Sequence, residues 1–438
     1  MPHDSSLTND RRSFLKSTAA ASAASLYTTN LFAGQVAGAN NRLRTAFIGM
    51  GRMGLGNLGH AMRQDNVEIV AVCDVYEPNL SKAVDKTNNQ AKGIKDFREI
   101  LADKSIDAVC ISTPDHWHAY MTVEACKAGK DVYVEKPICV TVDEGTKMVQ
   151  AARKYKRVVQ AGTMQRSGIH FQKAVEIVKS GDLGQITFVR TWNYGNLKPE
   201  GIGNPADAEP PKELNWDMWL GPAPLRPFNA NRFGVDPKEF SHFRWFWDYA
   251  GGMMTDWGVH LLDIVHMAFD EPMPTAVTAI GAKQFIKDNR DTPDTLQVTY
   301  EYPTFVATYE NRLGNANSMM GKGYGILFHG NKGTLFVDRS GYQLFPEKGS
   351  ALTELEVKSS NNANDSHWKN FLECIRTRQR PISDIEVCQR STTACLLGNV
   401  ALRSKLRLDW DSKRWTTQQA EARRLLAKED RKPWRIVV

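Results

Sequence analysis

Short apolar runs alternate with amphipathic stretches along the first third of the chain. The apolar runs are rich in β-branched residues, which is typical of buried strands, whereas the stretches between them have helical spacing. Strands are predicted at 43–48, 67–73, 106–111, 132–134 and 157–161, and helices at 78–89, 99–104 and 142–155 and in stretches ending near 63 and 128. Strands separated by helices pair in parallel through right-handed crossovers. This part is therefore predicted to be an α/β, doubly wound parallel sheet.

In the second half of the chain, the pattern changes to strands without intervening helices. Alternating or β-rich runs, split by glycine and proline, occur at 276–282, 295–302, 305–311, 326–329 and 333–338. They predict a large antiparallel sheet. Helical patterns at 171–179, 368–376 and 386–403 flank these runs.

The stretch 196–239 is rich in proline, glycine and tryptophan and follows neither pattern. Irregular segments of this length in compact domains usually cover a site or contact another subunit. The sequence leaves both interpretations open.

Length and composition indicate two domains. A chain of 438 residues with 42% hydrophobic residues is too long for one ordinary core. The net charge of +7 is modest, and no basic cluster with interleaved aromatic residues is present, which argues against nucleic-acid binding. The seven cysteines form neither a CxxC pair nor a Cys/His metal spacing, so we expect no metal and no disulfide framework.

Residues 1–39 have the features of an export signal. Asp10-Arg11-Arg12-Ser13-Phe14-Leu15-Lys16 precedes a weakly apolar, alanine-rich run, and Ala37-Gly38-Ala39 is an A-x-A type cleavage site. The segment resembles a twin-arginine signal and is too short and polar to span a bilayer. We expect a folded protein exported to the periplasm or another extracytoplasmic space, with no stable membrane insertion. The expected domains are 40–157 and 158–410, followed by a basic tail at 411–438.

The first strand runs directly into a glycine-rich turn and then a helix. The turn is Gly49-Met50-Gly51-Arg52-Met53-Gly54. In a strand–turn–helix context, such glycines permit a tight turn, a close approach of a pyrophosphate and helix–strand packing. The next strand ends at Asp74, twenty residues after Gly54. A carboxylate there accepts hydrogen bonds from ribose hydroxyls and repels a 2′-phosphate, which favours NAD over NADP.

Two further motifs follow strands of this sheet, at the edge where open α/β sheets bind ligands. In the first, Ser112-Thr113-Pro114-Asp115-His116-Trp117-His118, Pro114 would fix the loop, and Thr113 and His118 could reach the nicotinamide half. The alternative for His116 and His118 is helix packing and capping. Trp117 could stack on a sugar or pack half-buried.

The second motif is Val132-Tyr133-Val134-Glu135-Lys136-Pro137. Its apolar strand places Glu135 and Lys136 at the carboxyl edge of the sheet. A lysine there can lose hydration, so that its pKa falls and it can transfer a proton near neutral pH. A solvated charge at the end of a strand is the alternative.

A second group of chemically capable residues occurs in the run 251–263. If a helix begins near Thr255, Asp256, His260 and Asp263 share one face, whereas Trp257 and Leu261 share another. A polar stripe opposite an apolar one points to a site or to water. Metal binding is a poor alternative, because no third ligand has a suitable spacing.

With these motifs in view, the chain resembles the Gfo/Idh/MocA oxidoreductases along nearly all of its length after the signal. The resemblance implies a Rossmann domain followed by a mostly antiparallel, open-faced sheet domain, and a dimer or tetramer formed through that sheet. It also implies a cis peptide before Pro137, a lysine beside the nicotinamide, and Asp256 and His260 holding substrate hydroxyls, with the histidine able to act as the base. The turn of Gln165 and Arg166 would lie over the cofactor and near the substrate.

The expected activity is hydride transfer between NAD and the hydroxyl carbon of a sugar or polyol, with the cofactor retained because free NAD is scarce outside the cytoplasm. Catalysis is assigned to Lys136, Asp256 and His260, with His260 or Lys136 taking the proton. Substrate contacts are expected from these three residues, Arg166 and Trp117. Cofactor contacts are expected from Gly49, Met50, Gly51, Arg52, Met53, Gly54, Asp74, Ser112, Thr113, Pro114, His118, Glu135 and Gln165.

Two other functions remain open. The first is an NAD-dependent glycosidase acting by transient oxidation at C3 and elimination, although relatives of this kind often have EVP where this chain has Glu135-Lys136-Pro137. The second is a non-catalytic protein that senses sugars or nucleotides. The presence of Lys136, Asp256 and His260 together, and the expected export, argue against it.

Overall fold

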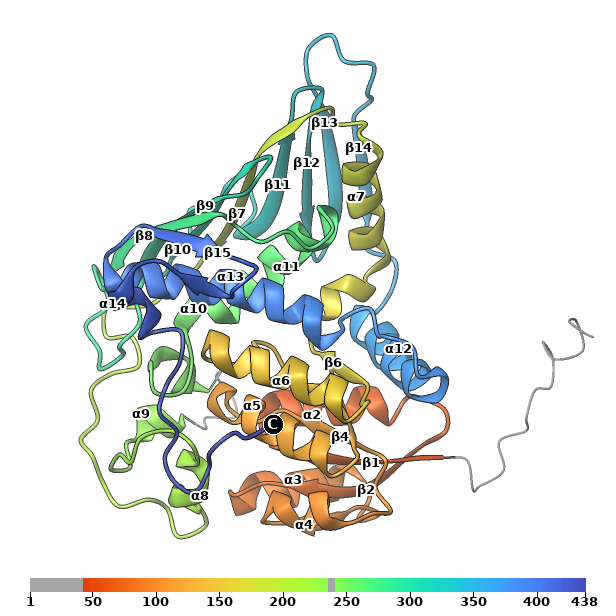
Figure 1. Ribbon diagram of the computed structural model, residues 1–438, viewed down its shortest axis with the longest axis vertical. Helices are drawn as coiled ribbons and strands as arrows, with labels where there is room; N and C mark the ends of the chain where they lie inside the picture. Colours follow the sequence, from red (N-terminus) through yellow and green to blue (C-terminus); the bar gives the residue numbers. More distant parts are fainter. Residues whose placement is uncertain (1–41, 235–240) are drawn as a thin grey trace, which may run out of the picture. The chain divides into compact units, whose positions relative to one another are not determined.

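The apolar runs of the first third form a six-stranded parallel sheet, in the order β3-β2-β1-β4-β5-β6 (Figure 1). The computed structural model describes residues 42–234 and 241–438, and Leu43–Val438 form one unit. The predicted export signal lies outside the described residues. The strands are β1 (Leu43–Ile48), β2 (Val67–Cys73), β3 (Lys92–Ile94), β4 (Ala108–Ile111), β5 (Asp131–Val134) and β6 (Val159–Ala161). The connecting helices are α2 (Arg52–Ala61), α3 (Glu77–Lys86), α4 (Phe97–Ala102), α5 (Asp115–Lys127) and α6 (Val142–Lys154).

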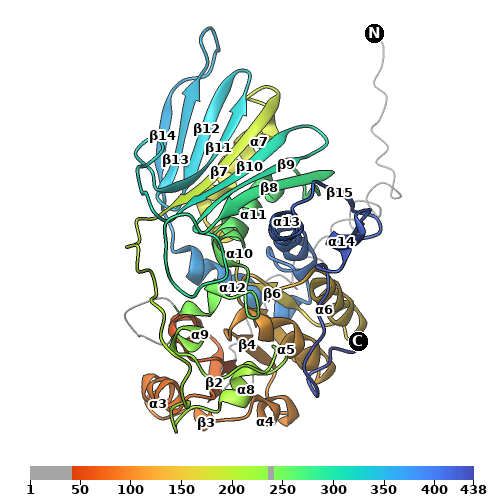
Figure 2. The ribbon, with the colours of Figure 1, turned by 90° about the vertical axis from the view of Figure 1, so that its left-hand side faces the viewer.

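The later strands form a ten-stranded sheet that is antiparallel except where β7 pairs with β10 (Figure 2). Its order is β14-β13-β12-β11-β7-β10-β9-β8-β15-β16. The strands are β7 (Ile186–Tyr194), β8 (Ala276–Ala282), β9 (Thr295–Glu301), β10 (Val306–Arg312), β11 (Tyr324–Gly330), β12 (Gly333–Asp338), β13 (Gly341–Pro346), β14 (Leu355–Lys358), β15 (Leu408–Asp411) and β16 (Thr416–Thr417). The predicted class, an α/β Rossmann-type sheet followed by a large antiparallel one, is confirmed.

Helices fill the space between the two sheets. These are η2 (Met164–Ser167), α10 (Gly252–Asp256), α11 (Gly258–Ala268) and α13 (Ile385–Ser404), whereas α7 (Ile169–Ser180) packs along β12 and β13 of the large sheet. Helices α11 and α13 pack on one face of the large sheet, and α13 also contacts α6 of the first (Figure 1). One hydrophobic core therefore runs through both sheets.

Helix α12 (Ala363–Thr377) returns from the large sheet to the first one. Trp368 is fully buried, and its ring stacks on that of Tyr133 with the centroids 4.6 Å apart. It also stacks on the ring of Phe47, with the centroids 5.6 Å apart. Strand β6 belongs to the first sheet although it lies beyond residue 157, and α12, from the range predicted for the second domain, packs against α2 of the first.

The irregular stretch after β7 lies against the first sheet, next to the end of β2. Leu214 forms an isolated bridge with Tyr76, and the Asn215 N–H donates to the Val75 carbonyl at 3.0 Å. Its short helices are α8 (Trp216–Leu220), α9 (Ala230–Phe233) and, after the undescribed 235–240, η3 (His242–Trp245). Of the two interpretations left open by the sequence, this position favours a cover.

The basic tail also packs back on the first sheet domain after α14 (Ala420–Arg423). Trp434 is buried, with its ring 4.9 Å from that of Trp117 and near those of Phe97 and Tyr120. The tail is therefore part of the packed structure as well as of its surface.

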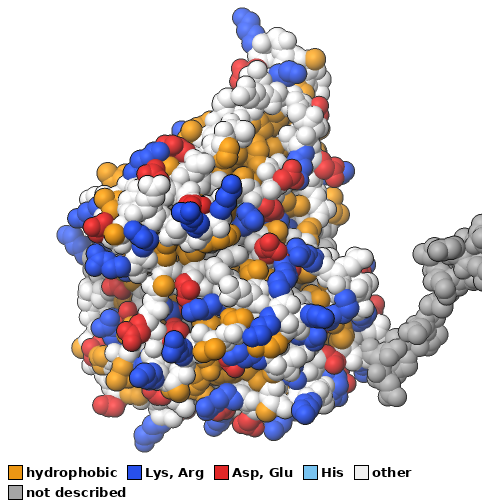
Figure 3. Space-filling view, viewed as in Figure 1, with side chains coloured by type: hydrophobic (Ala, Val, Ile, Leu, Met, Phe, Trp, Pro, Cys, Tyr) orange, Lys and Arg blue, Asp and Glu red, His pale blue; other side chains and the backbone are white. Residues whose placement is uncertain are grey.

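Charges of both signs are interspersed over the face shown in Figure 3. In 42–234 and 241–438, no helix is both long enough and apolar enough to cross a bilayer. Within the same ranges, no cluster of His, Cys, Asp and Glu side chains has the arrangement of a metal site.

Candidate active site

The glycine turn has the geometry that a dinucleotide requires. Gly49 has φ +85°, and a Cβ there would lie 2.7 Å from the Thr113 nitrogen. A Cβ on Gly54 would lie 1.9 Å from the Gly49 carbonyl oxygen, so this glycine lets α2 pack against the turn. Gly51, at the N-cap of α2, faces open space and offers no side-chain cap. The first backbone N–H groups of α2 are thus available to a phosphate.

Asp74 stands beside this turn at the end of β2. Its carboxylate accepts the Met50 N–H at 2.6 Å and the Tyr76 N–H at 2.8 Å. Burial raises the pKa of Asp74 to about 6, against the lowering effect of these hydrogen bonds. The carboxylate is therefore fixed in orientation and ionised at neutral pH, as binding of a ribose diol requires.

A cavity of about 740 Å³ extends from the glycine turn to helix α11. The stretch 196–234 contributes Leu197, Met218, Trp219 and Phe233 to its wall. Of the predicted site residues, those that line it are Gly49, Gly51, Arg52, Met53, Asp74, Ser112, Thr113, Pro114, Trp117, His118, Glu135, Lys136, Asp256 and His260.

At the far end of the cavity, Lys136 from the first sheet domain meets Asp256 from α10. The Lys136 ammonium donates to Asp256 Oδ1 at 2.8 Å and to the Asp256 carbonyl at 3.0 Å. Arg244 Nη1 lies 2.5 Å from the other carboxylate oxygen. Burial alone would raise the pKa of Asp256, but Arg244 and Lys136 outweigh it and hold the pKa well below its usual range. The peptide between Lys136 and Pro137 is cis, as the resemblance implied.

His260 lines the same end of the cavity. Burial, together with the charges of Lys136 and Arg339, lowers its pKa well below the ordinary histidine value, so the ring is neutral at pH 7. Its Nδ1 is buried, and no hydrogen bond to either ring nitrogen occurs within the described ranges. A neutral imidazole with an unused nitrogen is suited to accept a proton.

The helix expected through Asp256 and His260 is interrupted. Asp256 ends α10, and α11 begins at Gly258 after Trp257. The His260 N–H donates to the Trp257 carbonyl at 3.0 Å, which leaves the Asp256 carbonyl for Lys136. The expectation of one continuous helix was wrong, although both side chains reach the same cavity.

Glu135, which precedes the lysine, is held by side chains from both sheet domains. Asn57 Nδ2 donates to its carboxylate at 2.8 Å, and Asn57 in turn accepts the Trp368 indole N–H at 3.2 Å. Burial raises the pKa of Glu135. A Cβ at Gly162 would lie 2.9 Å from this carboxylate, so a glycine is needed there.

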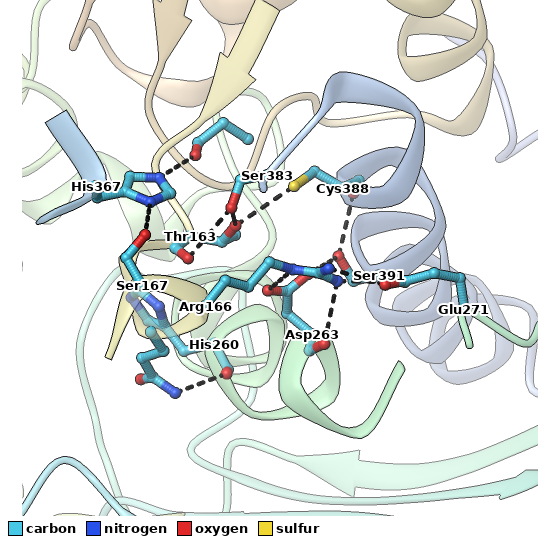
Figure 4. A network of polar contacts seen from close by, with 12 residues as sticks. Thr163, Arg166, Ser167, His260, Asp263, Glu271, His367, Ser383, Cys388 and Ser391 are labelled. Carbon is cyan, nitrogen blue, oxygen red and sulfur yellow. Dashed lines mark hydrogen bonds and ion pairs between the residues drawn. The ribbon is translucent and has the colours of Figure 1, made fainter. Parts of the chain in front are cut away.

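Arg166 and Asp263 are not among the residues that line the cavity, and they pair with each other (Figure 4). The Arg166 Nε donates to Asp263 Oδ2 at 2.7 Å, its Nη1 donates to Glu271 at 2.8 Å, and both Arg166 and Asp263 are buried. Arg166 was expected to contact substrate, but it does not line the cavity, and its charge is used in this pairing. For the same reason, Asp263 does not continue the polar stripe into the site.

Three predicted cofactor residues lie behind the cavity wall. Met50 and Gly54 shape the glycine turn. The Met50 N–H donates to the Asp74 carboxylate, and Gly54, having no Cβ, lets α2 approach the Gly49 carbonyl. Gln165 is buried, donates to the His260 carbonyl at 3.0 Å and accepts from Arg339. A direct cofactor contact from Gln165 was expected; the structure shows a residue that positions His260.

The histidines and the tryptophan after Pro114 are held by carbonyl groups. Trp117 and His116 both contact the Trp219 carbonyl, at 2.9 and 3.1 Å. His118 lies 2.7 Å from the Pro137 carbonyl and 2.8 Å from that of Thr113, while burial lowers its pKa to about 4. The packing interpretation is therefore favoured for Trp117 and His116, and His118 joins the two edge motifs.

Among the cavity residues that sequence reasoning missed are three ionisable ones whose charges act on Lys136, Asp256 or His260: Arg244, Arg339 and Asp115. Asp115 lay inside a quoted motif, and burial raises its pKa to about 8. The two arginines carry no local signal, since neither belongs to a motif near Lys136 or His260 in the sequence.

Family models cover most of the chain. Residues 43–163 match a model described as the oxidoreductase family, NAD-binding Rossmann fold, of Gfo/Idh/MocA proteins. Residues 175–436 match the C-terminal alpha/beta domain of the same family.

Curated relatives match over part of their length. The chain is 33% identical over 154 residues to an inositol 2-dehydrogenase of Salmonella typhimurium, covering 35% of this chain and 46% of that protein. It is 29% identical over 206 residues to a glycosyl hydrolase family 109 protein of Shewanella baltica, covering 40% and 44%. The chain thus spans less than half the length of these relatives.

Solved structures share the fold over most of this chain. One is the aldose-aldose oxidoreductase of Caulobacter crescentus, at 18% identity and a TM-score of 0.65, covering 84% of this chain and 99% of that one. Another is the WlbA dehydrogenase of Bordetella pertussis in complex with NADH and UDP-GlcNAcA, at 19% identity, a TM-score of 0.64 and the same coverage. Because the two family models match residues 43–163 and 175–436, the chain belongs to the Gfo/Idh/MocA family of NAD-binding oxidoreductases.

Proposed function

We propose that this protein transfers hydride between NAD and a hydroxyl-bearing carbon of a sugar or polyol. The observation that supports it is the meeting of Lys136, Asp256 and His260 at one end of the cavity whose other end carries the glycine turn and Asp74. The inositol 2-dehydrogenase relatives point to the same substrate class. Bound NAD would supply the hydride acceptor or donor.

The protein's own residues handle the proton. Removal of hydride from an alcohol carbon requires the hydroxyl proton to leave, and His260 is neutral and has a free nitrogen. The Lys136 ammonium, oriented by Asp256, places positive charge where the alkoxide develops. Of the two bases left open by the sequence, His260 fits better, because Lys136 already serves as the donor to Asp256.

Replacing Lys136 tests this assignment. A screen of sugars and polyols, followed at the nicotinamide absorbance, first identifies a substrate of the wild type. Lys136→Met is then expected to lower kcat by about 10²–10³-fold, the usual effect of removing a charge-stabilising donor, with the Kd for NAD unchanged.

The matched control is Lys173→Met, which removes an exposed lysine of α7 that pairs with Glu176. Wild-type turnover by Lys136→Met, or an equal loss in the control, would refute the assignment.

We also propose that the protein is exported by the twin-arginine route and retains its cofactor between turnovers. The support is the arginine pair and the cleavage site in residues 1–39. Protein purified from an export-competent host without added cofactor should release nicotinamide nucleotide on denaturation. An empty protein from such a host would argue against retention.

A second candidate is supported by the similarity to glycosyl hydrolase family 109 proteins. In that reaction, C3 of the sugar gives hydride to NAD, the C2 proton and the glycosidic substituent leave by elimination, water adds across the resulting C1–C2 double bond, and C3 recovers the hydride from NADH. An aryl glycoside separates the two functions, because release of aglycone with no net NADH would favour the glycosidase.

A further inference from the structure

Arg339 brings a positive charge to the catalytic end of the cavity. It lies in the turn between β12 and β13 and lines the cavity together with Trp257 and His260. Its guanidinium carbon is 4.8 Å from the centroid of the Trp257 ring. Its Nε donates to Gln165 Oε1 at 3.1 Å. These two contacts fix the plane of the guanidinium while using only one of its five N–H groups.

No carboxylate of the described residues lies within ion-pair distance of Arg339. The two other cations at this end, Lys136 and Arg244, both pair with Asp256. Burial lowers the pKa of Arg339, with only partial opposition from Tyr324 and Asp256. A partly buried guanidinium with unused donors is costly unless an anion arrives to accept from it.

The ion pairs of the described residues leave Arg339 as the unmatched cation of this end. Lys136 and Arg244 share the carboxylate of Asp256, whose pKa is held low. Two further acids line the cavity nearby: burial raises the pKa of Glu135, and it raises that of Asp115 to about 8, so Asp115 is protonated at neutral pH. Within the described residues, the charge of Arg339 would therefore be left uncompensated by a neutral sugar.

We propose that the substrate is an acidic sugar, whose carboxylate is bound by the terminal Nη atoms of Arg339 while its reacting hydroxyl lies at Lys136 and His260. The inference rests on the proposed hydride transfer and narrows its substrate class. A carboxylate suits the planar donor fork of a single arginine, which can bind both oxygens at once. The cofactor's own phosphates have a separate site at the glycine turn and the start of α2.

Matched pairs of sugars test the inference on the NAD-loaded protein. The pairs are glucose and glucuronate, galactose and galacturonate, and mannose and mannuronate, and glucose 6-phosphate serves as a phosphate probe. Binding is followed by calorimetry and by tryptophan fluorescence, and turnover at the nicotinamide absorbance. We expect at least one acid to bind at least about tenfold more tightly than its neutral partner, since truncating one member of a buried charge pair usually costs more than that.

Variants then test whether the preference for the acidic sugar depends on Arg339. Arg339→Met should remove the preference for the acid without changing NAD binding, and Arg339→Lys should restore part of it. Arg403→Met is the matched control, because Arg403 also lies over a tryptophan, Trp247, but it is exposed and does not line the cavity. This control should retain the full preference.

The outcomes separate this inference from the function on which it rests. Turnover of neutral sugars as good as that of acids, tighter binding of glucose 6-phosphate, failure of all three acids to bind, or a preference that survives in Arg339→Met would each overturn the inference. Arg339-dependent binding of acids without any nicotinamide reduction would support the inference and count against the proposed function.

Discussion

At the scale of single residues, burial sets the charge of each group in the cavity. Asp256 stays ionised because Arg244 and Lys136 outweigh its burial, whereas at Asp115 burial outweighs the same two cations and raises the pKa to about 8. His260 stays neutral because burial and two neighbouring cations oppose its charge. Beside Lys136, the cavity therefore presents the ionised Asp256 carboxylate and the neutral His260 imidazole to a substrate at neutral pH.

Asp74 gives a prediction for pH dependence. Its pKa of about 6 is raised, so the folded protein without cofactor holds this proton more tightly than the unfolded chain does. The contribution of Asp74 to stability therefore falls as the pH rises from about 4 to 6. Binding of the ribose diol requires the ionised form of Asp74. Affinity for NAD should therefore rise as the pH rises, and it should fall about tenfold for each pH unit below 6.

Scanning calorimetry of the cofactor-free protein and titration calorimetry with NAD, both between pH 5 and 7.5, measure the pH dependence of stability and of NAD affinity. Asp74→Asn should bind NAD more weakly at pH 7.5, lose this pH dependence and discriminate less against NADP. Asp85→Asn, at an exposed carboxylate of α3, is the control. An affinity for wild-type protein that does not change across this range would contradict the role of Asp74.

At the scale of elements, α12 packs against the first sheet domain and helps to fix the position of Glu135. Trp368 stacks on Tyr133, and its indole N–H reaches Glu135 through Asn57. Trp368→Ala is expected to lower the free energy of unfolding by about 3–5 kcal/mol through cavity formation. Trp368→Phe retains a ring but leaves Asn57 without its donor, and should cost about 1–3 kcal/mol.

Denaturant unfolding measures both changes, with Lys369→Ala, at an exposed position of α12, as the control. Trp368→Phe should also weaken catalysis more than Lys369→Ala does, because Glu135 loses its fixed position. A Trp368→Ala variant as stable as the wild type would show that α12 is not needed to hold the first sheet domain.

Strands could be predicted where apolar residues alternate with polar ones, or run without interruption, along the sequence. Strands β8 and β12 have the predicted bounds, since alternation or a continuous apolar run marks them. Strand β7 was not predicted, because its buried Thr191 and Asn193 look like loop residues in the sequence. Thr191 is accommodated in the sheet interior because its hydroxyl donates to the Thr308 carbonyl at 2.7 Å.

At the scale of the whole molecule, the cavity is assembled from segments far apart in the sequence. The glycine turn, Asp74 and Lys136 could be predicted because each follows a strand of a recognisable sheet. Arg339 could not, since only the pairing of β12 and β13 brings it to Trp257. The pairing of Arg166 could not be predicted either, because its partners, Asp263 and Glu271, lie about a hundred residues away. The predicted dimer or tetramer stays a prediction.

The most direct test of the account is a crystal structure of the protein with NADH bound. We predict the pyrophosphate at Gly51 and the start of α2, the adenosine ribose on Asp74, and the nicotinamide ring facing Lys136 and His260 at the other end of the cavity. A dinucleotide bound outside this cavity, or a nicotinamide ring directed away from both residues, would contradict the account.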